Sequence, residues 1–358
     1  MKRCTKCILP ETYASIKFDE EGVCSICKQA EHKREIDWST REKELKKILD
    51  KYKNLAKEWG NSYDCIVPFS GGKDSSYTLY MLKRVYGMKP LAVTFDHLFL
   101  TDVMKENRAN VLRKLGVDLI TFSPDWQVVK RLCVKSLNKT GDFCWHCHSG
   151  IFAYPTQIAV KYNIPLLIWG EPSAEYTSYY TYDDDERLDE KRFKDLIQMG
   201  IPVEEMTDDG MTLTDLSPYI FPSFDALKEL NVSSIYLGSY IPWDSRKQVE
   251  LIKRELGWKG GVVEGSFVDY DKVECKYIGV RDYLKYIKRG YGRTAQLASV
   301  DIRNGRMTRE EALRLAEEYD GKRPASLDSF LEDIEMSEEE FMEIANRHKV
   351  TVQTSESC

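Results

Sequence analysis

Apolar residues along the chain follow two spacings, one typical of helices and one typical of buried strands. Between residues 39 and 59 they recur every three or four positions, which predicts an amphipathic helix. Farther along, short apolar runs predict strands at residues 65–69, 91–95, 118–122, 166–169 and 234–238. Helical spacing follows each of the first three runs, to about residue 86, at 102–115 and at 126–137. A further helical stretch at 151–162 precedes the fourth run. This alternation predicts an α/β fold, a doubly wound parallel sheet with helices on both faces.

The remaining pattern divides the chain into three regions. We expect residues 1–38 to form a small ribbon, residues 39–260 an α/β domain, and residues 261–358 a mostly helical C-terminal region. The α/β domain contains an insertion at about 172–230. In the C-terminal region Thr308 and Ser337 are each followed three positions later by Glu, a pattern that marks the start of a helix.

A glycine loop stands where the first strand should end and a helix should begin. Two glycines let backbone N–H groups converge there, and the helix N-terminus adds positive potential, so the loop suits a phosphate group. Lys73 can neutralise a phosphate oxygen, and Asp74 can hold Mg²⁺ that bridges to the phosphates. The spacing differs from that of a Walker A loop. The residues predicted to bind phosphate in this loop are Ser70, Gly71, Gly72, Lys73, Asp74 and Ser75.

Two further strand ends carry residues suited to the same site. The second apolar run ends at Phe95 and Asp96, and the fourth is followed by Gly170 and Glu171. The carboxyl ends of parallel strands meet at one edge of a sheet, so these residues should converge on the phosphate loop. We expect Asp96 to contact the nucleotide or a second metal position, and Glu171 to orient a substrate.

The charge balance limits the partners. The net charge is −6 and the isoelectric point is near 5.6, which argues against broad binding of nucleic acid. No window approaches a membrane span and no signal peptide is visible, so we expect a cytoplasmic protein without membrane contact. A basic stretch from Arg281 to Arg293, with Arg303 and Arg306, either receives phosphates of a nucleotide-sugar or an RNA, or is a solvated helix face.

The insertion is rich in tyrosine and acid. Four tyrosines precede an acidic run at residues 183–186. The tyrosines are expected to pack or to form a lid over a nucleotide or sugar, and the run to be a solvated loop rather than a metal site. The tyrosines are Tyr176, Tyr179, Tyr180 and Tyr182.

Ten cysteines in a reducing compartment indicate metal ligands or thiols rather than disulfides. The first two pairs are separated by 16 residues, a spacing typical of a four-cysteine zinc site with a structural role. The predicted zinc ligands are Cys4, Cys7, Cys24 and Cys27. Cys65 and Cys133 fall in apolar patterns and are expected in the core, while Cys358 has no predicted role.

The glycine loop resembles the signature of the PP-loop ATP pyrophosphatases, which split ATP into AMP and pyrophosphate. With the four-cysteine N-terminus and several later blocks, the chain resembles the N-acetyl sugar amidotransferases of surface-polysaccharide and flagellin-glycan biosynthesis. Those blocks are the Cys144/Cys147 pair and residues 164–165, 169–171, 285–293 and 301–308. The resemblance spans nearly the whole chain, apart from the insertion.

This resemblance implies a reaction. AMP is transferred to the acetamido oxygen of a nucleotide-linked N-acetylated sugar with release of pyrophosphate, and ammonia then displaces AMP to give an acetamidino sugar. Glu171 could orient the substrate or the ammonia. The chain has only five histidines and no spare domain for a glutaminase. The resemblance therefore implies a separate glutaminase with a cyclase-like partner subunit as the ammonia source.

Three later cysteines leave alternatives open. Some tRNA-thiolating PP-loop enzymes hold a 4Fe–4S cluster with a matching pair and one later cysteine, which here correspond to Cys144, Cys147 and Cys275. The trio is either such a cluster, or a zinc site completed by His146 or His148, or a structural group. Two other functions stay open with it, an ATP-dependent tRNA thiolase and an ATP-binding scaffold without turnover.

Overall fold

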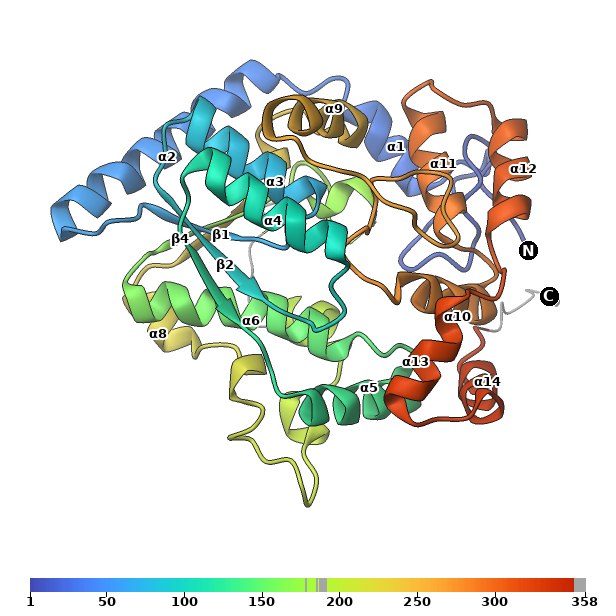
Figure 1. The fold of residues 1–358 in the computed structure, drawn as a ribbon. Coiled ribbons are helices and arrows are strands. Elements are labelled where there is room, and N and C mark those ends of the chain that lie inside the picture. Colours follow the sequence, from blue (N-terminus) through green and yellow to red (C-terminus); the bar gives the residue numbers. More distant parts are fainter. Residues whose placement is uncertain (178, 185, 187–191, 351–358) are drawn as a thin grey trace.

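The computed structural model describes residues 1–177, 179–184, 186 and 192–350. Within them, five strands form one parallel sheet in the order β3-β2-β1-β4-β5 (Figure 1). Ile66 lies opposite Leu91 on one side and Leu167 on the other. The strands are β1 (Cys65–Pro68), β2 (Pro90–Phe95), β3 (Leu119–Phe122), β4 (Leu166–Trp169) and β5 (Ser233–Tyr236). Each starts and ends within two residues of its predicted range, so the predicted parallel α/β class is confirmed.

Successive side chains of the strands feed two cores on opposite faces of the sheet. Cys65 and Val67 pack into the larger core, whereas Ile66 packs into a second core beneath α6. Helices therefore cover both faces (Figure 1). The first layer comprises α2 (Trp38–Trp59), α3 (Lys73–Tyr80), α4 (Asp102–Leu115) and α9 (Ser245–Leu256); the second contains α5 (Trp126–Thr140) and α6 (Trp145–Tyr162), and α8 (Phe224–Glu229) precedes β5.

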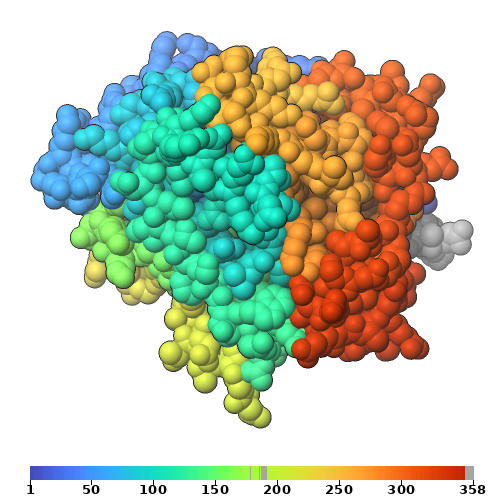
Figure 2. Space-filling model, in the orientation of Figure 1, coloured from blue at the N-terminus to red at the C-terminus, as the bar shows by residue number. Residues whose placement is uncertain are grey.

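The N-terminal ribbon packs directly on the C-terminal helices. Short antiparallel bridges join Arg3 to Pro10 and Phe18 to Cys24. Ile8 and Leu9 of the ribbon share one hydrophobic cluster with Ala295 and Ala312, so the two ends of the chain form a common core. The helices of these parts are α1 (Ser25–His32), α10 (Ile278–Arg289), α11 (Arg293–Arg303), α12 (Arg309–Tyr319), α13 (Ser326–Ile334) and α14 (Glu338–Arg347). In Figure 2 the C-terminal region lies flush against the α/β domain.

Helix boundaries differ from the predictions in two places. The helix expected at 151–162 begins at Trp145, because Trp145 is fully buried and its indole donates a hydrogen bond to the Ile201 carbonyl (2.9 Å). The Cys144/Cys147 pair therefore opens this helix instead of preceding it. The helix after the glycine loop ends at Tyr80 and continues as one π-helical turn, Met81–Val85. The division into three regions remains a prediction.

Several smaller expectations can be compared with the structure. Thr308 and Ser337 cap α12 and α14, each accepting a hydrogen bond from the N–H three residues on. Cys65 and Cys133 are fully buried, as expected, and Cys358 lies outside the described residues. In the part of the chain that the structure describes, no helix is both long and apolar enough to cross a membrane.

Candidate active site

The glycine loop lies between β1 and α3, as the sequence predicts. Gly71 has a φ of +87°, and a Cβ there would lie 2.3 Å from Cγ of Arg108, so only glycine fits this turn. The loop closes on itself through two serines: the Gly71 N–H donates to Oγ of Ser75 (3.2 Å) and the Gly72 N–H donates to Oγ of Ser70 (3.1 Å). Gly72 begins α3 without a side-chain cap. The loop therefore gathers serine hydroxyls and uncapped N–H groups at a helix N-terminus, the donor set that phosphate prefers.

Lys73 projects from this loop into a charged interior. It is buried, and its Nζ lies 2.7 Å from Asp74 Oδ2 and 3.4 Å from Asp271 Oδ1. Burial alone would lower the pKa of Lys73, but Asp74 and Asp271 raise it well above its ordinary value. Lys73 is therefore a permanent positive charge at the mouth of the loop.

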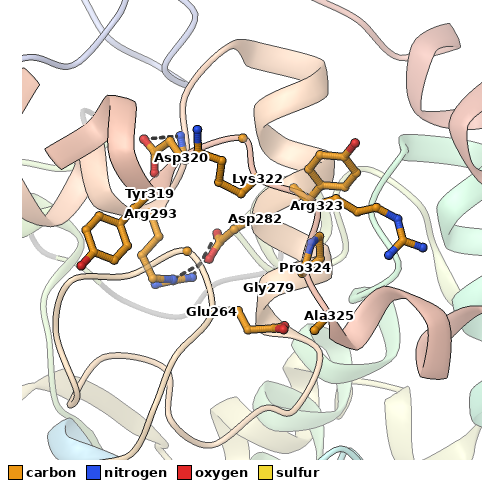
Figure 3. Close-up of a pocket in the computed structure, with 14 residues that line it drawn as sticks. Glu264, Gly279, Asp282, Arg293, Tyr319, Asp320, Lys322, Arg323, Pro324 and Ala325 are labelled. Carbon is orange, nitrogen blue, oxygen red and sulfur yellow. Dashed lines mark hydrogen bonds and ion pairs between the residues drawn. The ribbon is translucent and has the colours of Figure 1, made fainter. Parts of the chain in front are cut away.

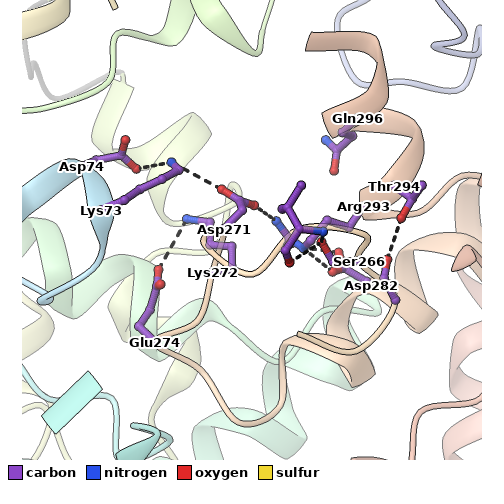
Figure 4. A network of polar contacts seen from close by, with 12 residues as sticks. Lys73, Asp74, Ser266, Asp271, Lys272, Glu274, Asp282, Arg293, Thr294 and Gln296 are labelled. Atoms are coloured by element: carbon purple, nitrogen blue, oxygen red, sulfur yellow. Dashed lines mark hydrogen bonds and ion pairs between the residues drawn. The ribbon is translucent and has the colours of Figure 1, made fainter. Parts of the chain in front are cut away.

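Asp271 extends the network into the C-terminal region. Its Oδ2 accepts a hydrogen bond from Arg293 Nη1 (2.5 Å), and Arg293 Nε donates in turn to Asp282 (2.6 Å). Figure 4 shows this chain of alternating charges running from the loop to α10 and α11. The glycine loop and the C-terminal helices are thus joined by buried ion pairs. The sequence gives no signal for Asp271, because almost 200 residues separate it from Lys73.

The carboxylates beside Lys73 form a site suited to a divalent cation. Oδ1 of Asp74 is buried and has no hydrogen-bond partner, although its other oxygen pairs with Lys73. Burial, and next the charge of Asp74, raise the pKa of Glu171 to about 8, against the opposing effect of Lys73. An unsatisfied buried carboxylate oxygen on Asp74 fits Mg²⁺, which takes oxygen ligands.

Asp96 and Gly170 lie near residues of the glycine loop, whereas Phe95 lies in the core. Asp96 accepts a hydrogen bond from the Leu98 N–H (2.9 Å), and its negative charge acts on Arg108, the side chain that packs against Gly71. Phe95 packs beneath Gly150 in the core. A Cβ at Gly170 would meet the hydroxyl of Thr78 and Cβ of Asp74, so this glycine allows β4 to approach α3 closely.

A cavity of about 940 Å³ opens beside Lys73. Lys73, Glu171 and Asp271 belong to its wall, and the other walls come from the ribbon, the insertion and the C-terminal helices. Neither Asp96 nor Phe95 belongs to this wall, so of the predicted site residues Lys73 and Glu171 face the cavity. A smaller pocket of about 200 Å³ shares Asp282 and Arg293 with it (Figure 3). The Asp282–Arg293 ion pair thus stands between the two hollows.

The basic stretch and three of the four tyrosines of the insertion line this cavity. All seven cations of the basic stretch line it: Arg281, Lys285, Lys288, Arg289, Arg293, Arg303 and Arg306. Tyr176, Tyr179 and Tyr180 also line it, whereas Tyr182 is buried against Trp38. In the acidic run, Asp183 pairs with Arg41, Glu186 is buried against Arg192, and Asp185 lies outside the described residues. The interpretation of the basic stretch as a solvated helix face is therefore wrong, because α10 and α11 turn these side chains inward.

The sequence does not predict that two tryptophans, Trp243 and Trp258, lie at the site. Nε1 of Trp258 donates a hydrogen bond to the Gly71 carbonyl (2.9 Å) and so helps to fix the conformation of the glycine loop. Trp243 is buried, lines the cavity, and its Nε1 has no partner. Both follow α-helical or loop segments in which an aromatic residue is ordinarily a packing residue. Their roles depend on tertiary contacts only.

The N-terminal cysteines meet as predicted. The four sulfur atoms lie within 4.8 Å of one another, with 3.9 Å between Cys4 and Cys27 and 3.7 Å between Cys7 and Cys24. Hydrogen bonds from Cys24 and Cys27 lower the pKa of the Cys7 thiol to about 7. Backbone N–H groups also point at the sulfurs, such as that of Cys24 at Cys4 Sγ (3.2 Å). Four converging, buried thiols with N–H donors form a metal site.

The sulfur atoms of Cys144, Cys147 and Cys275 are not all within 4.8 Å of one another, unlike those of the N-terminal cysteines. Cys144, Cys147 and Cys275 adjoin one hydrophobic cluster, and the charge of Cys275 adds to burial in raising the pKa of Cys147 to about 12. Among the described residues only the N-terminal group brings three or more ligand atoms within 4.8 Å. His146 is buried and contacts Cys133, while His148 lines the large cavity. A metal at the trio remains a prediction.

Comparisons with known proteins bear on these parts separately. Residues 264–354 match the family described as LPS biosynthesis protein WbpG-like, C-terminal domain. Two uncharacterized proteins of Methanocaldococcus jannaschii are 33% identical over 125 residues, 35% of this chain and 43% of the relative, and 32% identical over 158 residues, 42% and 58%. The chain thus spans about half the length of these relatives. A glutamine-hydrolyzing GMP synthase of Pyrobaculum aerophilum is 33% identical over 69 residues, 19% of this chain and 14% of the synthase.

Similar solved structures include a predicted subunit of tRNA methyltransferase from Methanocaldococcus jannaschii, with 15% identity and a TM-score of 0.30 over 62% of this chain and 86% of that one. NMN synthetase from Francisella tularensis has 14% identity and a TM-score of 0.28 over 64% and 98%. The match at residues 264–354 to the WbpG-like C-terminal domain supports, for that part of the chain, the predicted relation to surface-polysaccharide biosynthesis.

Proposed function

We propose that the protein is an ATP-dependent amidotransferase of surface-glycan biosynthesis. It adenylates the acetamido oxygen of a nucleotide-linked N-acetylated sugar, releases pyrophosphate, and lets ammonia displace AMP to form the acetamidino sugar. The observation that carries this proposal is the position of Lys73, buried between two carboxylates where the phosphate loop opens into the large cavity. The opposite wall of that cavity belongs to the WbpG-like domain, whose family acts in lipopolysaccharide biosynthesis.

The first half of the reaction needs a grip on pyrophosphate as it leaves. Lys73 and the N–H groups of Gly71 and Gly72 are fixed before ATP arrives, because the serine hydroxyls and Trp258 hold the loop in shape. Donors that do not reorganise stabilise the developing negative charge most effectively. The N–H groups of Gly71 and Gly72 keep their positions and exchange Oγ of Ser75 and Ser70 for phosphate oxygens, and the freed hydroxyls can donate to phosphate as well. Because the leaving group is held and the sugar fills the cavity, the acetamido oxygen can attack the α-phosphorus.

Asp74 is the residue that would hold Mg²⁺. Oδ1 of Asp74 offers an unused ligand position, and Glu171 lies in its electrostatic range. Bound Mg²⁺ would supply charge neutralisation on the phosphates of ATP. Asp271 is occupied by Lys73 and Arg293, so it is a structural member of the site.

The second half needs ammonia in its neutral, nucleophilic form. A carboxylate with a pKa near 8 can accept a proton from ammonium or from the attacking nitrogen at neutral to mildly alkaline pH. Glu171 meets this requirement and lines the cavity. We assign it the role of general base in amidine formation. A separate glutaminase, working with a cyclase-like partner, would supply the ammonia.

Zinc is the metal that best suits the N-terminal cysteines. A tetrahedral zinc ion with Zn–S bonds of about 2.3 Å places its sulfurs about 3.8 Å apart. The observed separations are 3.7 Å and 3.9 Å. Four thiolates leave no open position, so this zinc would be structural. For Cys144, Cys147 and Cys275 the alternatives of a 4Fe–4S cluster and a zinc site both stand.

The proposal is tested by measuring AMP and pyrophosphate from ATP with a panel of nucleotide-linked N-acetylated sugars and ammonium. Over many turnovers both products should form in equal amounts, and continued turnover should need both the sugar and ammonium. ADP and phosphate, or turnover that does not need the sugar, would contradict it. Turnover that needs tRNA and a sulfur donor instead would favour the thiolase alternative. The observation that supports this alternative is that Cys144, Cys147 and Cys275 adjoin the same hydrophobic cluster.

A further inference from the structure

One wall of the large cavity is built from both ends of the chain. The ribbon contributes Tyr13, which lies between the two cysteine pairs, and α10 and α11 contribute Lys288, Arg289, Gln296 and Arg303. Tyr13 stacks on Tyr291 with 5.2 Å between ring centroids. Its hydroxyl donates to the Tyr176 carbonyl (2.5 Å) and accepts from Gln296 (3.2 Å). The aromatic pair is thus fixed from three parts of the chain.

Among the described residues, the cations of this wall form no ion pair within 4.0 Å, although the charge of Asp142 acts on Lys288 from farther away. Lys288 donates only to the carbonyls of Thr140 (2.6 Å) and Gly141 (3.1 Å), and Arg289 donates to the carbonyl of Thr12 (2.7 Å). Nη1 of Arg303 is buried and has no hydrogen-bond partner in the part of the chain that the structure describes. Within the described residues, none of these three side chains has a carboxylate within 4.0 Å. The neighbouring Arg281, Arg293 and Arg306 are all paired with aspartates.

These three charges lie beside the aromatic pair. Arg303 acts electrostatically on Tyr13, Arg289 acts on Tyr291, and Lys288 and Arg289 act on each other. Three partly buried cations at one wall of a cavity favour an anionic ligand, because like charges repel one another. The unpartnered Nε1 of the buried Trp243 adds one more donor to the same cavity.

We propose that this wall binds a nucleoside diphosphate, the carrier part of the sugar substrate. Lys288, Arg289 and Arg303 would receive the two phosphates, and the Tyr13–Tyr291 pair would contact the nucleoside. The inference rests on the proposed function, because it places the carrier opposite the ATP loop and the sugar between them. A cavity of about 940 Å³ lies at the large end of the usual range for small-molecule sites, about 300–1,000 Å³.

The site also gives the four-cysteine ribbon a functional reason. Leu9, Tyr13 and Ile26 of the ribbon all line the cavity, and each is adjacent or close in sequence to a cysteine pair or lies between the pairs. A structural metal would therefore hold Tyr13 against α10 and α11. The ribbon is a wall of the substrate site.

Binding of UDP, measured by calorimetry with a non-hydrolysable ATP analogue and Mg²⁺ saturating the phosphate loop, tests the proposal. UDP should bind the wild type under these conditions. Arg303→Gln and Lys288→Gln should each weaken binding about tenfold or more, since each removes a charge-assisted hydrogen bond. Tyr13→Leu should weaken UDP but not pyrophosphate, and Tyr13→Phe, which keeps the ring but loses the hydroxyl bonds to Tyr176 and Gln296, should weaken UDP less than Tyr13→Leu. Arg113→Gln, an exposed arginine of α4, is the matched control and should bind normally.

Several results would overturn the proposal. These are no binding of UDP, displacement of UDP by the ATP analogue, equal affinity in Arg303→Gln, or competition by tRNA. Pyrophosphate that binds as tightly as UDP, with no effect of Tyr13→Leu, would also overturn it, because the site would then recognise free pyrophosphate alone. The proposed function is judged separately by formation of AMP and pyrophosphate, so a protein that turns over an N-acetylated sugar without binding UDP refutes only this inference.

Discussion

Replacing Asp271 with asparagine removes the negative charge that joins the phosphate loop to the C-terminal helices. At an effective dielectric constant of about 20, unit charges attract by about 5 kcal/mol at the 3.4 Å that separates Asp271 from Lys73. At the 2.5 Å that separates Asp271 from Arg293 the attraction is about 7 kcal/mol. Much of this sum is offset by the cost of burying the charges.

The net loss is set by what stays behind. In Asp271→Asn, Lys73 keeps Asp74 and Arg293 keeps Asp282, but both cations lose a shared buried partner. Breaking a buried ion pair by removing one member costs about 3–5 kcal/mol. We therefore expect the free energy of unfolding to fall by about 3–5 kcal/mol, and ATP affinity to fall because Lys73 is no longer held in place.

Urea unfolding followed by circular dichroism measures the first effect. The matched control is Glu106→Gln, which breaks an exposed ion pair with Lys259 and should change the free energy of unfolding by about 0.5 kcal/mol or less. Lys73 and Arg293 hold the pKa of Asp271 below its ordinary value despite burial, so the stability it provides is present above about pH 4 and lost as the pH falls. Equal unfolding free energies for Asp271→Asn and the control would refute this account of the network.

Three other changes have definite expected results. Asp74→Ala should abolish pyrophosphate release while the folded structure is retained, and undiminished release would refute its role; circular dichroism is the check on folding. Glu171→Gln should remove the rise in amidine formation with pH, which in the wild type should have a midpoint near pH 8 because the carboxylate is the active form; a wild-type rate that is flat from pH 6 to 10 would exclude a base with this pKa. Because the folded state raises the pKa of Glu171, its contribution to stability is lost as the pH rises through about 8, and Glu171→Gln should lessen that loss. Removing metal from the ribbon with a chelator should expose Ile8 and Leu9, loosen α11 and α12, and lower the thermal midpoint, with recovery on addition of zinc; an unchanged midpoint after verified metal removal would show that the four thiols need no ion.

The sequence predicts this fold well because each strand carries its own local signal. β1 and β4 are short apolar runs that end at glycine-containing loops, and the N-caps Thr308 and Ser337 fall where their spacing to Glu places them. The cysteine pairs also identify the ribbon, since ligand spacing is a local property of the chain. Such features survive folding because neighbouring residues determine them.

The remainder of the site depends on contacts between distant segments. Asp271, Trp243 and Trp258 acquire their roles only when the C-terminal region packs against the α/β domain. The start of α6 was also beyond local pattern, because burial of Trp145 against Ile201 extends the helix through the cysteine pair. For the basic residues of α10 and α11 the sequence allows both an inward and an outward face, and the packing of α10 on α13 and α14 and of α11 on the ribbon decides it.

The origin of one oxygen atom tests the central claim most directly. If the acetamido oxygen attacks the α-phosphorus of ATP, that oxygen leaves with AMP when ammonia displaces it. A nucleotide-sugar with heavy oxygen in its acetamido carbonyl, incubated with enzyme, ATP and ammonium, should therefore yield labelled AMP and an amidine free of label, as mass spectrometry would show. AMP without the label, or ADP in place of AMP, would contradict adenylation of the sugar.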